Sequence, residues 1–420
     1  MSSFLALLGG KPVRTQPFPD WPVWGPPEER RLLRTLRSGK WGRLQGPEVE
    51  EFEQTFATQH GCRHGIAVVN GTVSLRIGLL AAGIQAGDEV IVPPYTFLST
   101  ASAVIEANAI PVFVDVDPET YNLDPQAVAA AITPRTRAII PVHFAGLPAD
   151  MTALMALAKK HNLTVIEDAA HAHGASYKGQ PAGSIGHLGS FSFQSSKNLT
   201  SGEGGLITSN DDVLAAACRS IQNCGRIPEG VWYEHHVISA NYRLGEFQGA
   251  ILNCQLKRLE RQSITRDRNG RYLAERISRL PGVRPQKRTA DCTRHSYHLF
   301  MLRLDSEAFG APRAAVIQAL QAEGIPCSPG YGYPLHRQPL FRQQNFGPYL
   351  PDPAVRARFN RVECPQSDRI CQDSIWIEHS RFLGPKADMI HIAEAFEKIH
   401  EHREALTLWT KKQPAPAKRG

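Results

Sequence analysis

The feature that most constrains the fold is an alternation, between residues 64 and 210, of short apolar runs with amphipathic helical patterns. The helical patterns include VSLRIGLLAAG (73–83) and MTALMALAKKHN (151–162). Short, nearly continuous apolar strands separated by helices are typical of a largely parallel sheet covered on both faces. The sequence therefore predicts a large α/β domain with a mostly parallel seven-stranded sheet. The strand candidates are GIAVVN (65–70), DEVIVP (88–93), IPVFVDV (110–116), RAIIPVHF (137–144), LTVIED (163–168), GSFSFQ (189–194) and GGLITSN (204–210).

Two segments after this alternation have patterns of their own. Residues 246–280 show helical periodicity for most of their length, which predicts a connecting helix, with Asn269-Gly270 as the expected interruption. The segment 325–365 repeats Pro, Gly, Tyr and Arg and is too long for a routine connection. We interpret it as a functional loop region.

Beyond Pro281 the pattern changes to one strand and two helices, which predicts a smaller α+β domain. The strand is expected at 295–304 and the helices at 312–324 and 386–406. The resulting division is an N-terminal arm (1–25), a large domain (26–250), a connecting helix (251–280), a small C-terminal domain (281–406) and a flexible basic tail (407–420).

Composition excludes several classes of protein. Of 420 residues, 42% are hydrophobic and 21% charged, as in ordinary globular proteins. No run approaches the ~18 apolar residues of a membrane span, and the N-terminus lacks the basic residues of a secretory signal. We therefore expect a cytoplasmic protein without a membrane partner.

The charge and the metal-binding residue types point to no special partner. The net charge of +7 is not concentrated in one stripe apart from the tail, so we predict no nucleic-acid partner, and an anionic small ligand explains the balance equally well. The 8 cysteines form no CxxC pair and the 16 histidines form no HExxH, so we predict no metal site.

Candidate site residues follow the ends of the predicted strands, where open α/β sheets bind ligands. GIAVVN leads through Asn70, Gly71 and Thr72 into a helix, so backbone N–H groups and a hydroxyl face any anion at the helix start. The alternative is a Thr that only caps the helix after a tight turn.

Two further strand ends place a carboxylate and an amine. LTVIED ends in Glu167 and Asp168, which point to opposite sides of the strand, and a carboxylate there needs a cationic partner. GSFSFQSSKNLTSGEGG brings Ser192 and Lys197 close to a glycine-rich turn. The alternative for Lys197 is a surface lysine in a polar loop.

Together these residues resemble a site for pyridoxal 5'-phosphate, in which a lysine forms a Schiff base, a carboxylate pairs with the pyridine nitrogen and a helix start binds phosphate. The order NGT, TF, EDAAHA, SFSFQSSK and GEGG is similar to that of the DegT/DnrJ/EryC1/StrS aminotransferases of fold type I, over about residues 8–400. The resemblance implies a fold type I transferase that uses pyridoxal 5'-phosphate.

The resemblance also implies roles for individual residues. Lys197 forms the Schiff base and shuttles the proton, Asp168 pairs with the ring nitrogen, and His171 lies near the cofactor. Phe97 stacks on the ring, the alternative being core packing, and the alternative for His171 is a structural hydrogen bond. The remaining implied residues are Gly71, Thr72 and Ser192 for phosphate, Asn241 for the phosphate of a neighbouring subunit in a homodimer, and Tyr331 and His336, in GYGYPLH, for substrate.

Particular phrases narrow the resemblance within the family. LLGGKPVRT, PFPDWP, FSFQSSKNLT and DSIWIEH resemble the branch that aminates keto-cyclitols such as scyllo-inosose, and its neighbour, 3-amino-5-hydroxybenzoate synthase. This implies transfer of an amino group from glutamate or glutamine to a ring ketone. The main body of the family acts on nucleotide-linked keto-sugars.

Three alternatives stay open at the level of the sequence. The first is a nucleotide-sugar aminotransferase, whose diphosphate the basic residues of 325–361 would bind; these are Arg337, Arg342, Arg356, Arg358 and Arg361. The second is a dehydratase that uses the same cofactor, and the third is a cofactor-binding regulatory protein without turnover.

Overall fold

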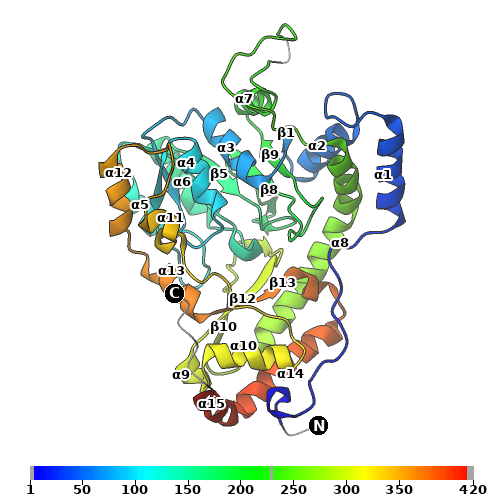
Figure 1. The fold of residues 1–420 in the computed structure, drawn as a ribbon, viewed down its shortest axis with the longest axis vertical. Helices are drawn as coiled ribbons and strands as arrows, with labels where there is room; N and C mark the ends of the chain where they lie inside the picture. Colours follow the sequence, from blue (N-terminus) through cyan, green and yellow to red (C-terminus); the bar gives the residue numbers. More distant parts are fainter. Residues whose placement is uncertain (1–3, 228–229, 414–420) are drawn as a thin grey trace.

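A seven-stranded sheet organises the upper part of the molecule in Figure 1. The computed structural model describes residues 4–227 and 230–413. The spatial order of the strands is β1-β9-β8-β5-β4-β2-β3, and β9 runs antiparallel to both of its neighbours while the other pairs are parallel. Each predicted run forms a strand, which confirms the mostly parallel α/β sheet. The strands are β1 (His64–Val68), β2 (Glu89–Val92), β3 (Ile110–Phe113), β4 (Thr136–Ile139), β5 (Thr164–Asp168), β8 (Leu188–Ser192) and β9 (Gly205–Ser209).

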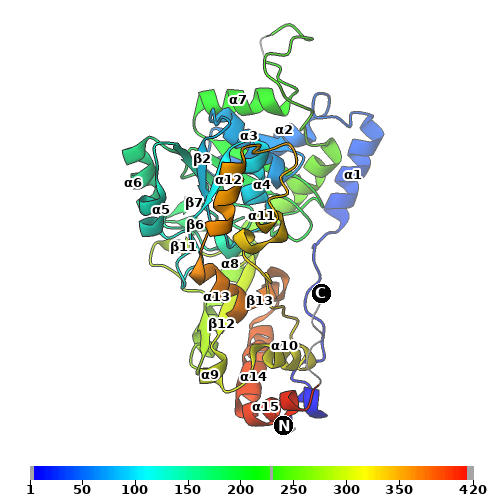
Figure 2. The same ribbon diagram turned by 60° about the vertical axis from the view of Figure 1, so that its left-hand side comes forward.

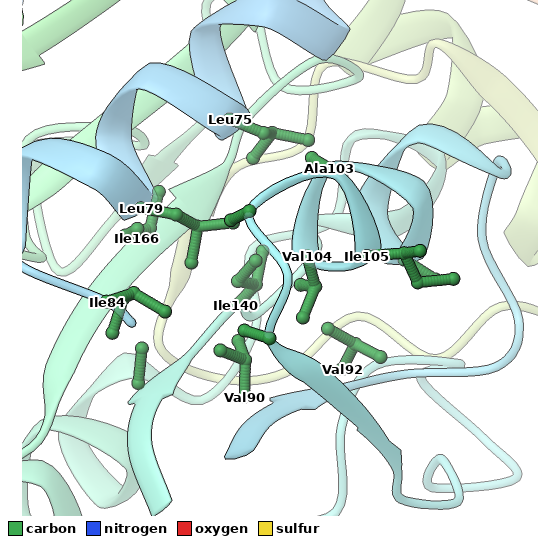
Figure 3. Close-up of a cluster of buried hydrophobic side chains, with 14 of the residues drawn as sticks. Leu75, Leu79, Ile84, Val90, Val92, Ala103, Val104, Ile105, Ile140 and Ile166 are labelled. Atoms are coloured by element: carbon green, nitrogen blue, oxygen red, sulfur yellow. The ribbon is translucent and has the colours of Figure 1, made fainter. Parts of the chain in front are cut away.

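Helices cover both faces of this sheet because successive strand residues point to opposite sides. In β2, Val90 and Val92 pack with Leu75 and Val104 on one face, while Ile91 belongs to the core on the other face (Figure 3). The first face is covered by α3 (Gly71–Ala81), α4 (Ser99–Glu106) and α7 (Asp212–Gln222). The second is covered by α2 (Glu48–Gln59), α5 (Pro125–Ala131), α6 (Met151–His161) and the first half of α8 (Glu246–Ile277).

The C-terminal part of the chain forms the narrower lower part of Figure 1 around its own core, which includes Phe300, Leu320 and Phe396. Its antiparallel sheet has the order β10-β12-β13, with β10 (Val283–Pro285), β12 (Leu299–Leu304) and β13 (Ser374–Glu378). Its helices are α9 (Ser306–Phe309), α10 (Arg313–Ala322), α13 (Pro365–Asp373), α14 (Lys386–Glu401) and α15 (Arg403–Lys411). A small sheet of β11 (Cys292–Arg294), β6 (Ser176–Tyr177) and β7 (Gln180–Pro181) joins this part to the upper one.

The long helix α8 corrects one prediction. It continues through Asn269 and Gly270, where the sequence predicts an interruption. The Asn269 side chain donates hydrogen bonds to the carbonyl oxygens of Phe382 and Gly384, both at 2.9 Å. A Cβ at Gly270 would lie 2.5 Å from the Tyr297 ring. Both residues therefore serve close packing against the C-terminal part instead of ending the helix.

The segment 325–365 is also more ordered than a loop region. It contains α11 (Pro339–Arg342) and α12 (Pro353–Arg358), and its buried Phe341 and Phe359 pack on Phe113 at the edge of the upper sheet. Apolar burial, which the Pro and Gly content conceals, fixes most of this segment. The first residues of the predicted tail (407–420) belong to α15, which extends to Lys411, and residues 414–420 lie outside the described ranges.

The N-terminal arm links the two parts of the molecule. Leu5 and Phe18 pack in the C-terminal core. From there the chain runs along the molecule to α1 (Pro26–Ser38) beside the upper part, as the dark blue trace in Figure 2 shows. No helix among the described residues is long and apolar enough to cross a membrane.

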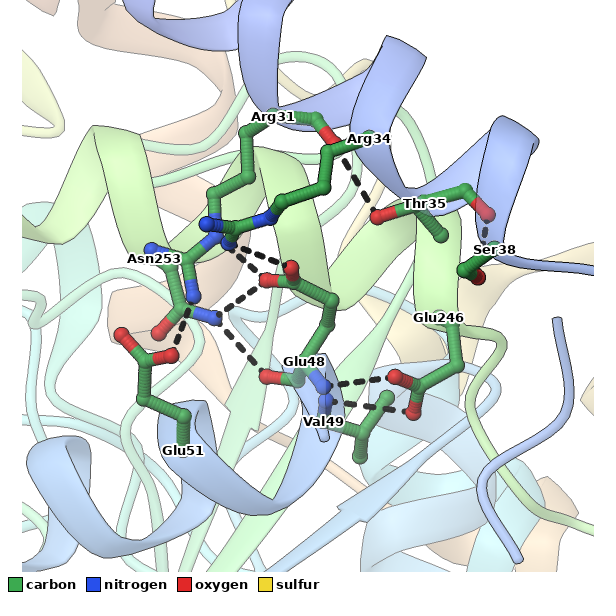
Figure 4. A network of polar contacts seen from close by, with 9 residues as sticks. All are labelled: Arg31, Arg34, Thr35, Ser38, Glu48, Val49, Glu51, Glu246 and Asn253. Atoms are coloured by element: carbon green, nitrogen blue, oxygen red, sulfur yellow. Dashed lines mark hydrogen bonds and ion pairs between the residues drawn. The ribbon is translucent and has the colours of Figure 1, made fainter. Parts of the chain in front are cut away.

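A polar network fixes α1 and α2 to the start of α8 (Figure 4). The buried Glu48 carboxylate accepts hydrogen bonds from Arg31 and, at 2.8 Å, from Arg34. Glu246, in the first turn of α8, accepts the N–H groups of Glu48 and Val49 at 2.6 and 3.2 Å, which satisfies two of the free donors at the start of α2.

Candidate active site

A cavity of about 730 Å³ lies where the carboxyl ends of the upper strands meet the C-terminal part. This is the edge of an open α/β sheet where ligands bind. Eight of the ten predicted site residues line it, and they come from five separate places in the sequence. The eight are Gly71, Thr72, Phe97, Asp168, His171, Ser192, Lys197 and Tyr331.

The start of α3 forms one end of the cavity. Asn70 is the N-cap of this helix and accepts the Val73 N–H at 2.9 Å, so Thr72 is not the cap. The Thr72 hydroxyl instead lies 2.6 Å from that of Ser99. A Cβ at Gly71 would lie 2.7 Å from that of Ser192, so the helix start and β8 approach as closely as a glycine allows. Free N–H groups and hydroxyls gathered at one helix start form an anion site.

The two carboxylates at the end of β5 have different surroundings, as the alternation along the strand predicts. Glu167 points away from the cavity and accepts hydrogen bonds from His143 at 2.8 Å and from the N–H groups of Gly183, Ile185 and Gly186 at 2.6 to 2.8 Å. Burial alone would raise its pKa, but these donors hold that pKa below the ordinary value. Glu167 is therefore a structural anion.

Asp168 points into the cavity and has fewer partners. Its carboxylate accepts the Thr100 hydroxyl at 2.8 Å and the Ala170 N–H at 3.2 Å. Burial raises its pKa above the ordinary value, although the Thr100 hydrogen bond and the charge of Lys197 act in the opposite direction. A buried carboxylate with free acceptor capacity needs a cationic partner, and it would find one in a protonated ring nitrogen.

Lys197 is half-buried and lies after a turn in which its N–H donates to the Gln194 carbonyl oxygen at 2.9 Å. Burial lowers the pKa of its amine to about 8, against the stabilising charge of Asp168. About a tenth of the amine is then unprotonated at pH 7, far more than for an ordinary lysine, and the unprotonated form is the one that acts as a nucleophile or base. The structure therefore excludes the alternative of a surface lysine.

Two histidines stack on the same side of the cavity. The rings of His171 and His298 lie 4.2 Å apart between centroids, at 28°. Burial lowers the pKa of both well below the ordinary value, so both are neutral. The His171 Nδ1 atom is buried without a hydrogen-bond partner among the described residues. That unpartnered atom fits contact with a bound group.

Several lining residues are absent from the sequence-based set. Some of them, such as Thr100 and Gln194, lie close to the strand-end motifs, and the others come from the N-terminal arm and from positions beyond 290. The phrases PFPDWP and DSIWIEH contain Trp21, Trp376, Glu378 and His379, and the resemblance of these two phrases was the available signal, whereas HSYHLF, with His298, was interpreted only as part of a strand. The missed residues include Trp21, His298, Ser328, Trp376, Glu378 and His379.

Two predicted residues do not line this cavity. Asn241 is exposed, and its side-chain oxygen accepts the Arg243 N–H at 3.2 Å. Its contact with a neighbouring subunit stays a prediction. His336 is fully buried, with Nε2 3.7 Å from the Asp368 carboxylate, so the structure does not bring it to the cavity. No group of three or more potential metal ligands occurs in the described part of the chain.

The doubly covered sheet, the buried amine and the facing carboxylate define an α/β enzyme with fold type I architecture. The chain belongs to the DegT/DnrJ/EryC1/StrS aminotransferase family, which matches residues 25–397. It is an aminotransferase, and the predicted family, fold and enzyme class are confirmed.

Individual relatives match nearly the whole chain. L-Glutamine:2-deoxy-scyllo-inosose aminotransferase of Streptomyces kanamyceticus is 39% identical over 436 residues, covering 96% of this chain and 99% of the relative. The crystal structure of 3-amino-5-hydroxybenzoic acid synthase has a TM-score of 0.83 at 36% identity, covering 92% of this chain and 100% of that one. The structure of NtdA of Bacillus subtilis, with bound cofactor PMP, has a TM-score of 0.77 at 25% identity, covering 89% and 81%.

Proposed function

We propose that this aminotransferase binds pyridoxal 5'-phosphate in the cavity and transfers the amino group of L-glutamine to the ketone of an unphosphorylated cyclitol of the scyllo-inosose type. The observation that carries the proposal is the convergence of the Lys197 amine, the Asp168 carboxylate and the start of α3 on one cavity. The Bacillus subtilis relative holds PMP, the aminated form of the same cofactor.

The residues present fit this cofactor. The start of α3, with Thr72 and Ser192, would hold the phosphate, and the close approach at Gly71 leaves no room for a side chain there. Asp168 would pair with the ring nitrogen, and the exposed Phe97 would cover a ring face. When bound, the cofactor supplies an electron sink for the carbon that loses its proton.

The chain's own part in the reaction is proton transfer. Lys197 Nζ, with a pKa lowered to about 8 by burial, takes the proton from the amino-bearing carbon of the donor. In the second half of the reaction the same amine delivers a proton to the carbon that was the ketone of the acceptor. In both halves of the reaction, the Asp168 carboxylate would stabilise the positive charge of the ring nitrogen with which it pairs.

The placement of the arginines supports a neutral acceptor over a nucleotide sugar. Arg337 binds Asp368 through two hydrogen bonds of 2.6 Å, and Arg358 binds Glu89 at 2.9 Å. Arg356 donates to backbone carbonyls of its own segment. Among the described residues, no arginine lines the cavity, whereas a diphosphate needs cations. A polyol ring needs hydrogen-bonding groups, which Ser328, Tyr331 and Glu378 offer on the wall opposite the strand ends.

A homodimer with shared sites is part of the proposal. The segment that precedes Asn241 exposes Trp232, Tyr233 and Ile238, the last with 99% of its surface accessible. Exposed apolar groups of this size mark a protein interface. Mixing Asn241→Ala and Lys197→Ala chains should restore about a quarter of wild-type activity, because half of the randomly paired dimers then contain one complete site. Full activity of an isolated monomer would contradict the dimer.

The function is tested by loading the purified chain with pyridoxal 5'-phosphate and L-glutamine and then offering three ketones separately. These are scyllo-inosose, 2-deoxy-scyllo-inosose and a 4-keto nucleotide sugar, with the amine product read by mass spectrometry. We expect amination of the cyclitols, unchanged in Arg337→Ala and Arg342→Ala. Amination of the nucleotide sugar alone would contradict the proposed cyclitol acceptor. A product that has lost a water molecule would indicate a dehydratase. Cofactor binding without turnover would indicate a regulatory protein.

A further inference from the structure

The peptide that carries Lys197 is held by two side chains from opposite ends of the sequence. The indole N–H of Trp21, in the N-terminal arm, donates to the Ser195 carbonyl oxygen at 3.0 Å. The Nε2 atom of His379, just after β13, lies 2.9 Å from the Ser196 carbonyl oxygen. The two rings also contact one another edge to face, with centroids 4.6 Å apart. Two consecutive carbonyls before Lys197 are therefore fixed from outside their own loop.

A buried arginine lies behind this pair. Arg266, on α8, is fully buried, and one terminal guanidinium nitrogen lies 3.1 Å from Nδ1 of His379. The guanidinium carbon lies 5.3 Å from the centre of the Trp21 ring. No carboxylate lies within 4.0 Å of it among the described residues, and its Nε and other terminal nitrogen have no hydrogen-bond partner there. A buried cation without a counter-ion is destabilising, so its contacts with His379 and Trp21 are where a function for it is sought.

The hydrogen-bonding rules of the three groups allow one state of the His379 ring. A guanidinium only donates, so Nδ1 must carry a lone pair, and a carbonyl oxygen only accepts, so Nε2 must carry the hydrogen. Arg266 and Ser196 thus demand the same neutral tautomer in the same orientation. The other neutral tautomer or a protonated ring would turn an N–H toward the guanidinium, and a flipped ring would replace the Nδ1 lone pair with a C–H.

We propose that Arg266 is a positioning residue for Lys197. By fixing the tautomer and orientation of His379, it directs the Nε2 hydrogen to the Ser196 carbonyl and holds the peptide that aims the Lys197 amine into the cavity. The guanidinium does not touch the cavity itself, because it does not belong to the lining, whereas Trp21 and His379 do. The inference rests on Lys197 as the reactive amine of the proposed function.

The test measures the Lys197 amine in the cofactor-free chain, so it needs neither cofactor nor turnover. Competitive acetylation at a series of pH values, read by peptide mass spectrometry, gives the pKa of this amine. In His379→Leu the charge of Arg266 stays but the link to Ser196 is lost. We expect that pKa to rise by at least about half a pH unit, a roughly threefold fall in labelling near neutral pH, because a freed lysine becomes hydrated.

Three further variants separate positioning from simple stability or charge. His379→Gln keeps an N–H for Ser196 and an acceptor for Arg266, so we expect the pKa of the Lys197 amine to stay at its wild-type value. Arg266→Met should raise the pKa of the Lys197 amine as much as His379→Leu does, and the double variant should raise that pKa no further. Arg276→Met, on the same helix as Arg266, breaks a half-buried ion pair with Glu397 and should leave the pKa of the Lys197 amine unchanged.

The outcomes are decisive in either direction. An unchanged Lys197 titration in folded His379→Leu would overturn the proposal, as would a shift in Arg266→Met alone, which would assign the effect to charge. If Arg266→Met does not fold, the contrast between His379→Leu and His379→Gln decides. If the wild-type chain aminates none of the ketones but the variants show the expected changes in the Lys197 pKa, the proposed function is overturned and the positioning role of Arg266 stands.

Discussion

The two walls of the cavity are built in different ways. One wall consists of residues at or just after the carboxyl ends of strands of the upper sheet, such as Gly71, Asp168 and Ser192. The opposite wall takes Trp21 from the arm and residues such as Tyr331 and Glu378 from the C-terminal part. The first wall offers an anion site, a carboxylate and an amine, whereas the second offers aromatic faces and hydrogen-bonding groups. This difference suggests that the first wall carries the chemistry and the second selects the acceptor.

The largest expected effect is at the first wall. Lys197→Ala should reduce the amination rate by roughly 10⁴-fold while leaving cofactor binding measurable, because in the proposed function the amine carries the proton while the start of α3 binds the phosphate. Steady-state turnover and equilibrium dialysis of pyridoxal 5'-phosphate check both parts. Turnover of Lys197→Ala near the wild-type rate would show that the first wall does not carry the chemistry.

Asp168→Asn should lower turnover by roughly 10²- to 10³-fold, because an amide cannot stabilise the positive charge that the carboxylate faces. Donor and acceptor half-reactions should slow together, since both depend on the same ring nitrogen. Stopped-flow measurement of each half-reaction checks this. A loss confined to one half-reaction would show that Asp168 contacts a substrate instead.

Gly71→Ala should weaken the binding of pyridoxal 5'-phosphate by about tenfold, because a Cβ there would lie 2.7 Å from that of Ser192 and push the helix start away from β8. Gly78→Ala is the matched control on the same helix. Its Cβ would meet its nearest neighbour, Leu188, at 3.4 Å, so cofactor affinity should not change. Equal effects of the two substitutions would mean that α3 responds as a whole and has no local anion site.

The smallest effect is expected at the second wall. Tyr331→Phe keeps the edge-to-face packing on Trp376, with centroids 4.7 Å apart, and removes only the hydroxyl. We expect KM for the cyclitol to rise about 3- to 10-fold, the value of one hydrogen bond, with the L-glutamine half-reaction unchanged. A change in the L-glutamine half-reaction would contradict the view that the second wall acts only in selecting the acceptor.

The same contrast explains what the sequence could predict. Near-continuous apolar runs predict strands from local sequence, and the ends of such strands lie at the ligand-binding edge of the sheet. The positions of Asp168 and Lys197 could therefore be predicted from the sequence alone. His298 and His379 enter the cavity through long-range packing that no local spacing records. His336 belongs to a motif beside the cavity, but the apolar packing of its segment buries it. Asn269 and Gly270 have turn-forming residue types, yet packing against Tyr297 and Phe382 overrides that preference.

The N-terminal arm has a consequence for the order in which the chain assembles during synthesis. Arg14 pairs with Asp388, 374 positions later, and the Ala6 N–H donates to Glu323, 317 positions later. The ribosome therefore releases the arm long before its partners exist, and Trp21 can reach Ser195 in its final setting only when residues near the C-terminus have emerged. The sheet can form on the nascent chain, whereas the lysine loop is completed by Trp21, which is made before the sheet, and by His379, which is made after it.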